Sequence, residues 1–152
     1  MSPARLSERI VTTRLAWVRE MLARIRSLPL DSYETFASDE RNIASAESYL
    51  RRALEALLDL GRHILAKAFA VATTEYKEIA TRLEETGVVT VAQARSLERL
   101  AGYRNRLLHF YHEVGSQELY EICARQLADV DTTTEAIAAW ITQHPDLVDR
   151  KA

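Results

Sequence analysis

The sequence predicts an all-α protein, an up-and-down bundle of four main helices with one shorter helix. Only 4 glycines and 3 prolines occur among 152 residues, which is too few for a turn-rich β fold. Apolar residues recur at alternating intervals of three and four over long segments, the spacing of one helix face. The connections between these segments are short. We therefore expect consecutive helices to be antiparallel, within a single domain that spans residues 1–152.

The first two long helices are expected over residues 3–26 and 39–69. Ser2 would cap the first, residues 27–38 would form a loop, and Ser38 would cap the second. The apolar stripe of the first helix is Val11, Leu15, Val18, Leu22 and Ile25. The second carries a seam like that of a coiled coil, which favours packing along a neighbour at a shallow angle. This seam consists of Ile43, Ala46, Leu50, Ala53, Leu57, Leu60 and Ile64.

Two further helices follow, and the sequence marks their ends. A shorter helix over residues 74–86 should stop at Gly87, because glycine readily adopts the left-handed conformation that ends a helix. Thr90 and Gln93 have the spacing of a capping box, which predicts that the next helix begins there. Gly102 lies inside that helix and could mark a bend between a lead-in segment and the part that follows.

The last helix is expected to begin after Gly115 and to end before Pro145. Its apolar stripe is Leu119, Cys123, Leu127, Val130, Thr134, Ile137 and Ile141. The cysteine in this stripe is the only one in the chain, so no intramolecular disulfide can form. A single thiol fits a reducing compartment.

Charge and hydropathy limit the partners of the protein. The 20 basic and 22 acidic residues give a net charge of −2, so no general positive field would hold nucleic acid. An RNA partner would have to be bound by a local patch. The start of the chain has no apolar core of signal-peptide length, and no segment approaches the ~20 apolar residues of a membrane span. These features predict a cytoplasmic protein with no membrane partner.

Residues 101–116, AGYRNRLLHFYHEVGS, combine a core-facing stripe with an unusual polar face. At about 100° per residue, one side of this helix carries Leu100, Tyr103, Leu107, Phe110 and Val114. Asn105, His109 and His112 fall on the opposite side and Arg104 flanks them, so these polar groups should point away from the core of the subunit. Tyr111 falls at the border of the two faces.

Leu108 is an apolar residue among these polar side chains, and it suggests that a second surface covers them. Isolated exposed leucines are common in proteins. Here, however, the leucine lies between Arg104 and the histidines, so we expect it at the interface of a two-fold homodimer. Such a dimer would bring two copies of Arg104 and His109 towards one cleft.

The polar residues of this helix could cleave RNA. His109, with an unperturbed pKa near ~6.5, can accept or donate a proton at neutral pH. Arg104 stays cationic and can stabilise a phosphate or its transition state. Asn105 lies one turn before His109 and can hydrogen-bond the imidazole or a substrate oxygen. These groups suit transesterification of RNA, in which the 2′-hydroxyl attacks the adjacent phosphate and no metal is required.

Other interpretations of the same residues remain open. Arg, Asn and His on one helix face can form an ordinary solvated surface. His109, His112 and Glu113 could bind a metal ion, but no third clear ligand is present, so we expect no metal site. His63 is expected at the surface. The chain contains no phosphate-binding glycine loop, zinc motif or nucleophile elbow.

Four residues separate Arg104 from His109, and one residue separates His109 from Tyr111. This spacing resembles the signature of the HEPN superfamily, in particular of HepT toxins from HEPN/MNT toxin–antitoxin systems. The segment LAGYRNRLLHFYHEV is similar to the motif helix of that family, including the asparagine directly after the arginine. ERNIASAESYLRRALEALLDLGRHI is similar to its long second helix. The resemblance covers roughly residues 35–140.

The resemblance implies a helical homodimer that acts as a metal-independent endoribonuclease toxin without a cofactor. Arg104 and His109 would carry catalysis on an RNA substrate, tRNA or mRNA, with Asn105 in support. The implied partner is a minimal nucleotidyltransferase (MNT) antitoxin, which uses ATP to transfer AMP to Tyr111. The added bulk and negative charge would block the cleft and neutralise its cation.

Two alternatives predict different behaviour. A non-catalytic HEPN-like module would serve only as partner and substrate of the nucleotidyltransferase, and the purified protein would not cleave RNA in EDTA. In a purely structural bundle, substitutions of Arg104 and His109 would have no effect.

Overall fold

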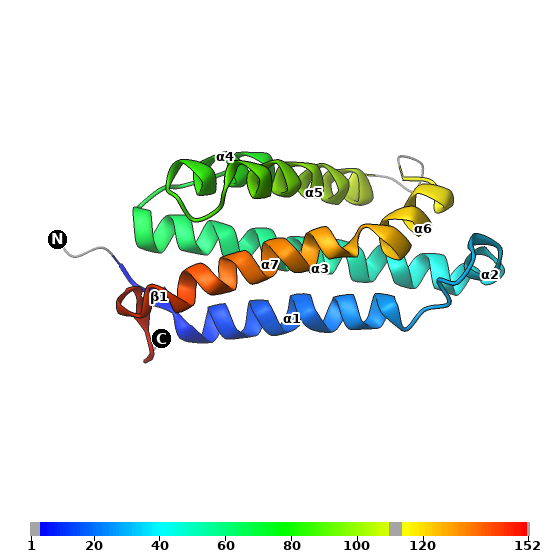
Figure 1. Ribbon diagram of the computed structural model, residues 1–152, viewed down its shortest axis with the longest axis horizontal. Helices are drawn as coiled ribbons and strands as arrows, with labels where there is room; N and C mark the ends of the chain where they lie inside the picture. Colours follow the sequence, from blue (N-terminus) through cyan, green and yellow to red (C-terminus); the bar gives the residue numbers. More distant parts are fainter. Residues whose placement is uncertain (1–3, 110–113, 152) are drawn as a thin grey trace.

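The computed structural model describes residues 4–109 and 114–151, without the side chains of Leu108 and His109. Four long helices lie side by side with alternating directions: α1 (Glu8–Arg26), α3 (Glu40–Phe69), α5 (Val91–His109) and α7 (Leu127–Thr142) (Figure 1). Three shorter helices join them: α2 (Tyr33–Ala37), α4 (Tyr76–Glu85) and α6 (Ser116–Arg125). A 3-10 turn, Pro145–Leu147, follows α7. The all-α fold expected from the sequence is confirmed, and the dimer stays a prediction.

Helix α3 forms the centre of the bundle. Its 30 residues contact all six other α-helices. The expected seam is buried from Ala46 to Ile64, and Ile43 at its first turn is partly buried. The seam residues are joined by Leu54, Leu58 and Leu65, so the apolar surface of α3 is wider than a two-position seam. A helix covered on several sides must carry a broad apolar surface, which leaves few positions for polar groups.

Two helix ends follow the predicted local chemistry. Gly87 adopts φ +80° after α4, the amide of Val88 donates to the carbonyl of Leu83 at 2.9 Å, and the amide of Gly87 donates to Glu84. This is the Schellman arrangement, in which a left-handed residue closes the last turn. At the start of α5, the Thr90 amide donates to Gln93 Oε1 at 2.8 Å and the Gln93 amide donates to Thr90 Oγ1 at 3.2 Å. The predicted capping box is confirmed.

The first helix begins later than the sequence suggested. Ser7 is its cap, and its Oγ accepts a hydrogen bond from the Ile10 amide at 3.2 Å. The preceding residues form a two-residue strand, β1 (Leu6–Ser7), which pairs in parallel with β2 (Val148–Asp149). The expected cap, Ser2, lies outside the described residues.

His63 is not the plain surface residue that the sequence suggested. It is partly buried, and its Nε2 accepts a hydrogen bond from the backbone amide of Ser7 at 3.0 Å. The side chain therefore ties the first described strand to α3. An imidazole can accept in this way only while that nitrogen is unprotonated.

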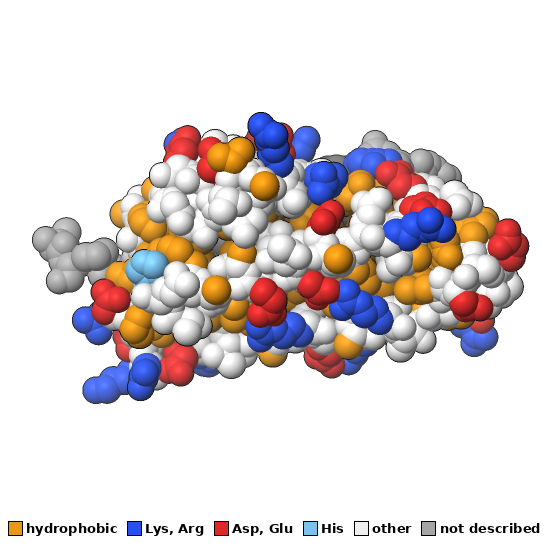
Figure 2. Space-filling model, viewed as in Figure 1, with side chains coloured by type: hydrophobic (Ala, Val, Ile, Leu, Met, Phe, Trp, Pro, Cys, Tyr) orange, Lys and Arg blue, Asp and Glu red, His pale blue; other side chains and the backbone are white. Residues whose placement is uncertain are grey.

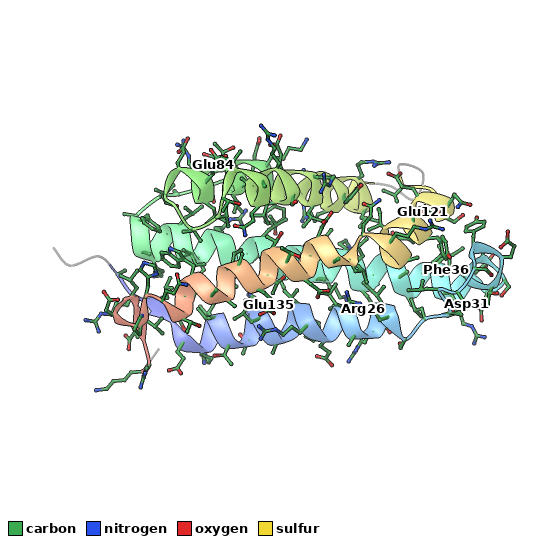
Figure 3. All side chains as sticks on the ribbon, viewed as in Figure 1. Arg26, Asp31, Phe36, Glu84, Glu121 and Glu135 are labelled. Carbon is green, nitrogen blue, oxygen red and sulfur yellow. The ribbon has the colours of Figure 1, made fainter. Side chains whose placement is uncertain are left out.

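The expected loop over residues 27–38 contains a short helix. Ser32 caps α2, and Phe36 of that helix is fully buried where α2 meets the end of the bundle (Figure 3). The Tyr120 hydroxyl donates to the Leu30 carbonyl at 2.9 Å, which holds the preceding segment against α6. Asp39, not Ser38, caps α3 through the Arg41 amide.

The expected last helix is two helices. It divides at Gln126 into α6 and α7, and the side-chain Oε1 of Gln126 accepts a hydrogen bond from the Tyr103 hydroxyl at 3.2 Å. The predicted apolar stripe is buried in both pieces, because the break leaves those residues on the core side. By contrast, α5 runs through Gly102 without a break, and a bend at this glycine stays a prediction.

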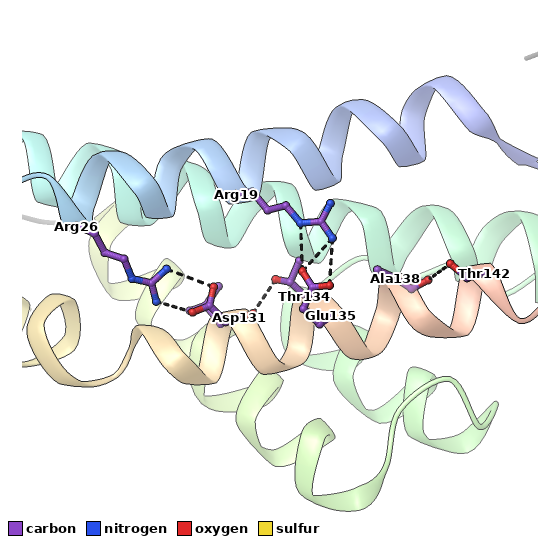
Figure 4. A network of polar contacts seen from close by, with 8 residues as sticks. Arg19, Arg26, Asp131, Thr134, Glu135, Ala138 and Thr142 are labelled. Atoms are coloured by element: carbon purple, nitrogen blue, oxygen red, sulfur yellow. Dashed lines mark hydrogen bonds and ion pairs between the residues drawn. The ribbon is translucent and has the colours of Figure 1, made fainter.

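Ion pairs join α1 and α7 along the surface. Arg19 binds both carboxylate oxygens of Glu135, at 2.9 and 3.2 Å from its Nη2, and Arg26 pairs with Asp131 (Figure 4). Charged and hydrophobic side chains are interspersed over the face shown in Figure 2. No helix in the described part of the chain is long and apolar enough to cross a membrane.

Candidate catalytic cleft beside the motif helix

Arg104 lies in a cleft between α5, α3 and α4. The sequence predicted that this side chain would point away from the core of the subunit, but only 19% of it is exposed. Its Nε is 3.5 Å from Glu55 Oε1 of α3. The Nε–H is buried and makes no hydrogen bond to any described residue, so Glu55 acts on it through charge rather than as a hydrogen-bond acceptor. The arginine is positioned by its own subunit.

Tyr76, the first residue of α4, provides the flat surface on which Arg104 rests. The guanidinium carbon of Arg104 is 4.5 Å from the centre of the tyrosine ring, and that of Arg62 from α3 is 4.9 Å away. Both distances are those of cation–π contacts. One ring therefore holds two cations from two different helices.

A hydrogen bond to α3 fixes the hydroxyl of Tyr76. The hydroxyl donates to Asp59 Oδ1 at 2.9 Å, and Asp59 Oδ1 also lies 3.6 Å from Arg62 Nη1. Burial and this hydrogen bond raise the pKa of Tyr76, while the charges of Arg104 and Arg62 oppose the rise. The phenol therefore stays neutral near pH 7, as a donor to Asp59 and a support for the arginines.

A cavity of about 630 Å³ opens beside this stack. Arg62 and Tyr76 line it together with Thr74, Glu75, Lys77, Arg104 and Asn105. Three of these seven residues are cations and one is an anion. A pocket with this lining suits an anionic ligand better than an apolar one.

The structure brings two of the predicted catalytic residues together. Asn105 lines the same cavity as Arg104, and its Oδ1 accepts a hydrogen bond from Arg104 Nη1 at 3.3 Å. His109 is the last residue of α5, one turn beyond Asn105, so the two share a helix face. The side chains of His109 and Leu108, and residues Phe110, Tyr111, His112 and Glu113, lie outside the described residues.

Arg106, the other arginine of the motif, has a different role. Its Nη2 is 2.6 Å from Glu118 Oε1 and its Nη1 is 2.9 Å from Glu118 Oε2, which joins α5 to α6. The hydrogen bonds from Arg106 hold the pKa of Glu118 below its usual value. This bidentate pair supports the motif helix and does not line the cavity beside Arg104.

Sequence reasoning missed the residues that surround Arg104. Glu55, Asp59 and Arg62 are spaced by four and three residues on α3, so they form a polar stripe on a helix that is otherwise largely apolar. That stripe was a usable signal. No comparable pattern singles out Tyr76 and Lys77, because they reach the cavity through the packing of α4 against α5.

Comparison with known proteins identifies the family. Residues 18–137, most of the chain, match the model of the family described as ribonuclease HepT-like. The chain belongs to this HepT-like family. The resemblance drawn from the motif is thereby confirmed. A search of curated protein sequences returns no significant match.

Solved structures show the same HepT-like fold. A toxin–antitoxin complex with AMP-PNP is 21% identical and aligns over 87% of this chain and 99% of that chain, with a TM-score of 0.78. A tri-AMPylated HEPN toxin of Shewanella oneidensis, solved with an MNT antitoxin, is 22% identical over 86% and 97% of the two chains, with a TM-score of 0.77. The cytosolic protein YutE of Bacillus subtilis is 19% identical over 92% and 94%, with a TM-score of 0.77.

Proposed function

We propose that this protein is the ribonuclease toxin of a toxin–antitoxin pair. The observation that carries the proposal is the position of Arg104, which lies beside Asn105 in an open cavity on the helix that also carries His109. Family membership supports RNA cleavage as the reaction. The active form in this proposal is a homodimer in which Leu108 contributes to the interface.

Cleavage would proceed by transesterification. His109 takes the proton of the ribose 2′-hydroxyl, and the 2′-oxygen forms a bond to the adjacent phosphorus. The bond from phosphorus to the 5′-oxygen breaks, and that oxygen takes a proton from the protonated His109 of the second subunit. The products are a cyclic phosphate and a 5′-hydroxyl.

Arg104 would stabilise the charge that develops on the phosphate oxygens, and the cleft favours this role. A guanidinium held by Tyr76 and Glu55 loses little freedom when it binds the transition state. Asn105 would hold the arginine or a substrate oxygen through its amide. Every group in this scheme belongs to the protein, so the proposed reaction requires no metal.

The proposed regulator is an MNT nucleotidyltransferase antitoxin. It would transfer AMP from ATP to the phenolic oxygen of Tyr111 and release pyrophosphate. The solved complexes with antitoxin, one of them tri-AMPylated, support this partner. AMP on Tyr111 would bring negative charge to the motif that carries Arg104 and would compete with RNA for that cation.

Cleavage of cellular RNA by the unmodified protein in EDTA tests the proposal. We expect Arg104→Ala and His109→Ala each to reduce the cleavage rate at least ~100-fold, the scale of losing a transition-state contact or a general base. Arg95→Ala is the matched control: it removes an exposed arginine from the opposite side of α5 and should leave the rate unchanged.

Two results would contradict the proposal. If the unmodified wild-type protein cleaves no RNA but still accepts AMP, the non-catalytic module is the correct interpretation. If both variants retain full cleavage, Arg104 and His109 are not the catalytic residues.

A further inference from the structure

The cavity extends well beyond Arg104, and this extension has no part in the reaction described above. Arg62, Thr74 and Lys77 line it from α3 and from the segment that begins α4. The lining of the cavity carries three cations, Arg62, Lys77 and Arg104, and one carboxylate, Glu75. Cations that the cleavage step does not use can bind a further phosphate of the same ligand.

The two arginines of the cavity are held as a pair. The centre of the Tyr76 ring lies 4.5 Å from the guanidinium carbon of Arg104 and 4.9 Å from that of Arg62, so one ring contacts both cations. Like charges repel, and in this structure the nearby carboxylates of Glu55 and Asp59 offset part of that repulsion. A bound ligand with several negative charges would offset the remaining repulsion.

The donors of the arginine pair are incompletely used. The Nε atoms of both Arg62 and Arg104 are buried without a hydrogen bond to any residue that the structure describes. An arginine has five N–H donors, so the described residues satisfy the hydrogen-bonding capacity of each guanidinium only in part. A phosphate that bridges the outer edges of the two groups would receive charge-assisted hydrogen bonds.

Lys77 supplies the third cation. It is exposed, and no carboxylate among the described residues lies within ion-pair distance of it. It is the second residue of α4, whose cap residue Glu75 makes no side-chain hydrogen bond to the helix. Lys77 can therefore turn to a ligand at the mouth of the cavity without breaking an existing pair.

We propose that Arg62 and Lys77 form a second phosphate subsite, which binds the phosphodiester next to the one that is cleaved. Tyr76 is the positioning residue, because its ring contacts the guanidinium groups of both Arg62 and Arg104. The subsite rests on the proposed function and names its substrate as a single strand of RNA, read through its backbone. It also explains how a chain with net charge −2 can bind RNA, because local cations replace a general positive field.

The test of the subsite is the binding of a short fluorescein-labelled 2′-O-methyl oligouridine. Its fluorescence anisotropy is measured over a range of salt concentrations. This probe cannot be cleaved because its 2′-oxygens are blocked. We expect Arg62→Ala and Lys77→Ala each to weaken binding about tenfold, the scale of one charge-assisted contact. Each should also reduce the slope of log K against log salt by about 0.7, the value for one phosphate contact on a single strand.

Arg52→Ala is the matched control, because it removes an exposed arginine from the same helix as Arg62 and should change neither affinity nor slope. Cleavage kinetics give a second readout. Arg62→Ala should raise KM with little change in kcat. Tyr76→Leu should lower kcat as well, since it releases Arg104, and Tyr76→Phe, which keeps the ring, should restore most of kcat.

The outcomes separate the subsite from the proposed function. If wild-type protein cleaves RNA while Arg62→Ala and Lys77→Ala bind the oligouridine as wild type does, the subsite is overturned and the function stands. If wild-type protein cleaves no RNA but oligouridine binding depends on both cations, Arg62 and Lys77 bind an RNA phosphate and the proposed cleavage fails. If these residues are needed for free AMP and not for the oligouridine, the cavity is a mononucleotide site and the subsite is overturned.

Discussion

Arg104 and Arg106 are two residues apart on one helix, yet their surroundings give them different roles. Arg106 forms a bidentate pair with Glu118 in which both side chains are more than one third exposed, and such a pair contributes about 1 kcal/mol or less to stability. Arg104 is 19% exposed, rests on Tyr76 and keeps a buried Nε–H that makes no hydrogen bond within the described part of the chain. The contacts of the two arginines therefore differ: Arg106 joins α5 to α6, whereas Arg104 lines the cavity.

Tyr111 provides a test of regulation at the level of one residue. We expect the intact mass of the protein, co-expressed with a cognate MNT nucleotidyltransferase, to increase by one or more AMP residues, and the increase to be absent in Tyr111→Phe. The reason is chemical: phenylalanine keeps the ring but lacks the oxygen that would attack the α-phosphate of ATP. Tyr103→Phe is the control, since Tyr103 lies in α5 and its hydroxyl donates a hydrogen bond to Gln126. An increment that persists in Tyr111→Phe would mean that another residue accepts AMP.

At the scale of the elements, α4 packs closely against α3 at Gly61. A Cβ atom on Gly61 would lie 2.9 Å from Ile79 Cγ2 and 3.0 Å from Leu83 Cδ1, closer than side chains tolerate. Both contacts come from buried residues of α4. The same helix supplies Tyr76 and Lys77, so Gly61 also determines how near the wall of the cavity comes to α3.

Gly61→Ala should therefore destabilise the protein. Overpacking costs about 1–3 kcal/mol, while alanine regains about 1 kcal/mol of helix propensity, so we expect a net loss of about 1 kcal/mol in the free energy of unfolding. Gly102→Ala is the matched control. Its Cβ would meet only Lys77 Cε at 3.9 Å, an ordinary contact, so propensity alone should stabilise by about 0.5–1 kcal/mol. Urea denaturation measures both. Equal stabilisation by the two substitutions would contradict the close approach.

The sequence correctly predicted the helix ends that depend only on residues nearby in the chain. The capping box of Thr90 and Gln93 and the glycine stop at Gly87 need only residues within one turn, and both are found. The apolar stripes were also predicted, because helical periodicity is a local property. The start of α1 was predicted too early, since Leu6 and Ser7 pair with a strand more than 140 residues away.

At the scale of the whole molecule, His63 joins the two ends of the chain to the central helix. Its Nε2 accepts from the Ser7 amide, and Leu6–Ser7 pair with Val148–Asp149. Burial, followed by the charges of Lys67 and Arg14, lowers the pKa of His63 below its ordinary value of 6.5. The folded state therefore favours the neutral imidazole that this hydrogen bond requires.

This lowered pKa predicts how stability depends on pH. Because the unfolded chain binds the proton more readily, the contribution of His63 is fully present above pH ~6.5 and is lost as the pH falls through the folded pKa. We expect the free energy of unfolding to decrease from pH ~7 to ~5. His63→Gln, which keeps an acceptor that does not titrate, should show a smaller decrease over that range. A decrease of equal size in both proteins would exclude His63 as its source.

The sequence by itself determined the helical fold, the buried stripes and the residues of the motif helix, because each depends on spacing along one chain segment. It also predicted the family, which the comparison confirms. Only the tertiary structure decided that Arg104 lies in a cavity with Arg62, Tyr76 and Lys77. These residues come from three helices, and they meet because the close packing of α4 on α3 brings the ring of Tyr76 into contact with both arginines. No local pattern encodes such a meeting, since it depends on which faces of distant helices are buried against each other.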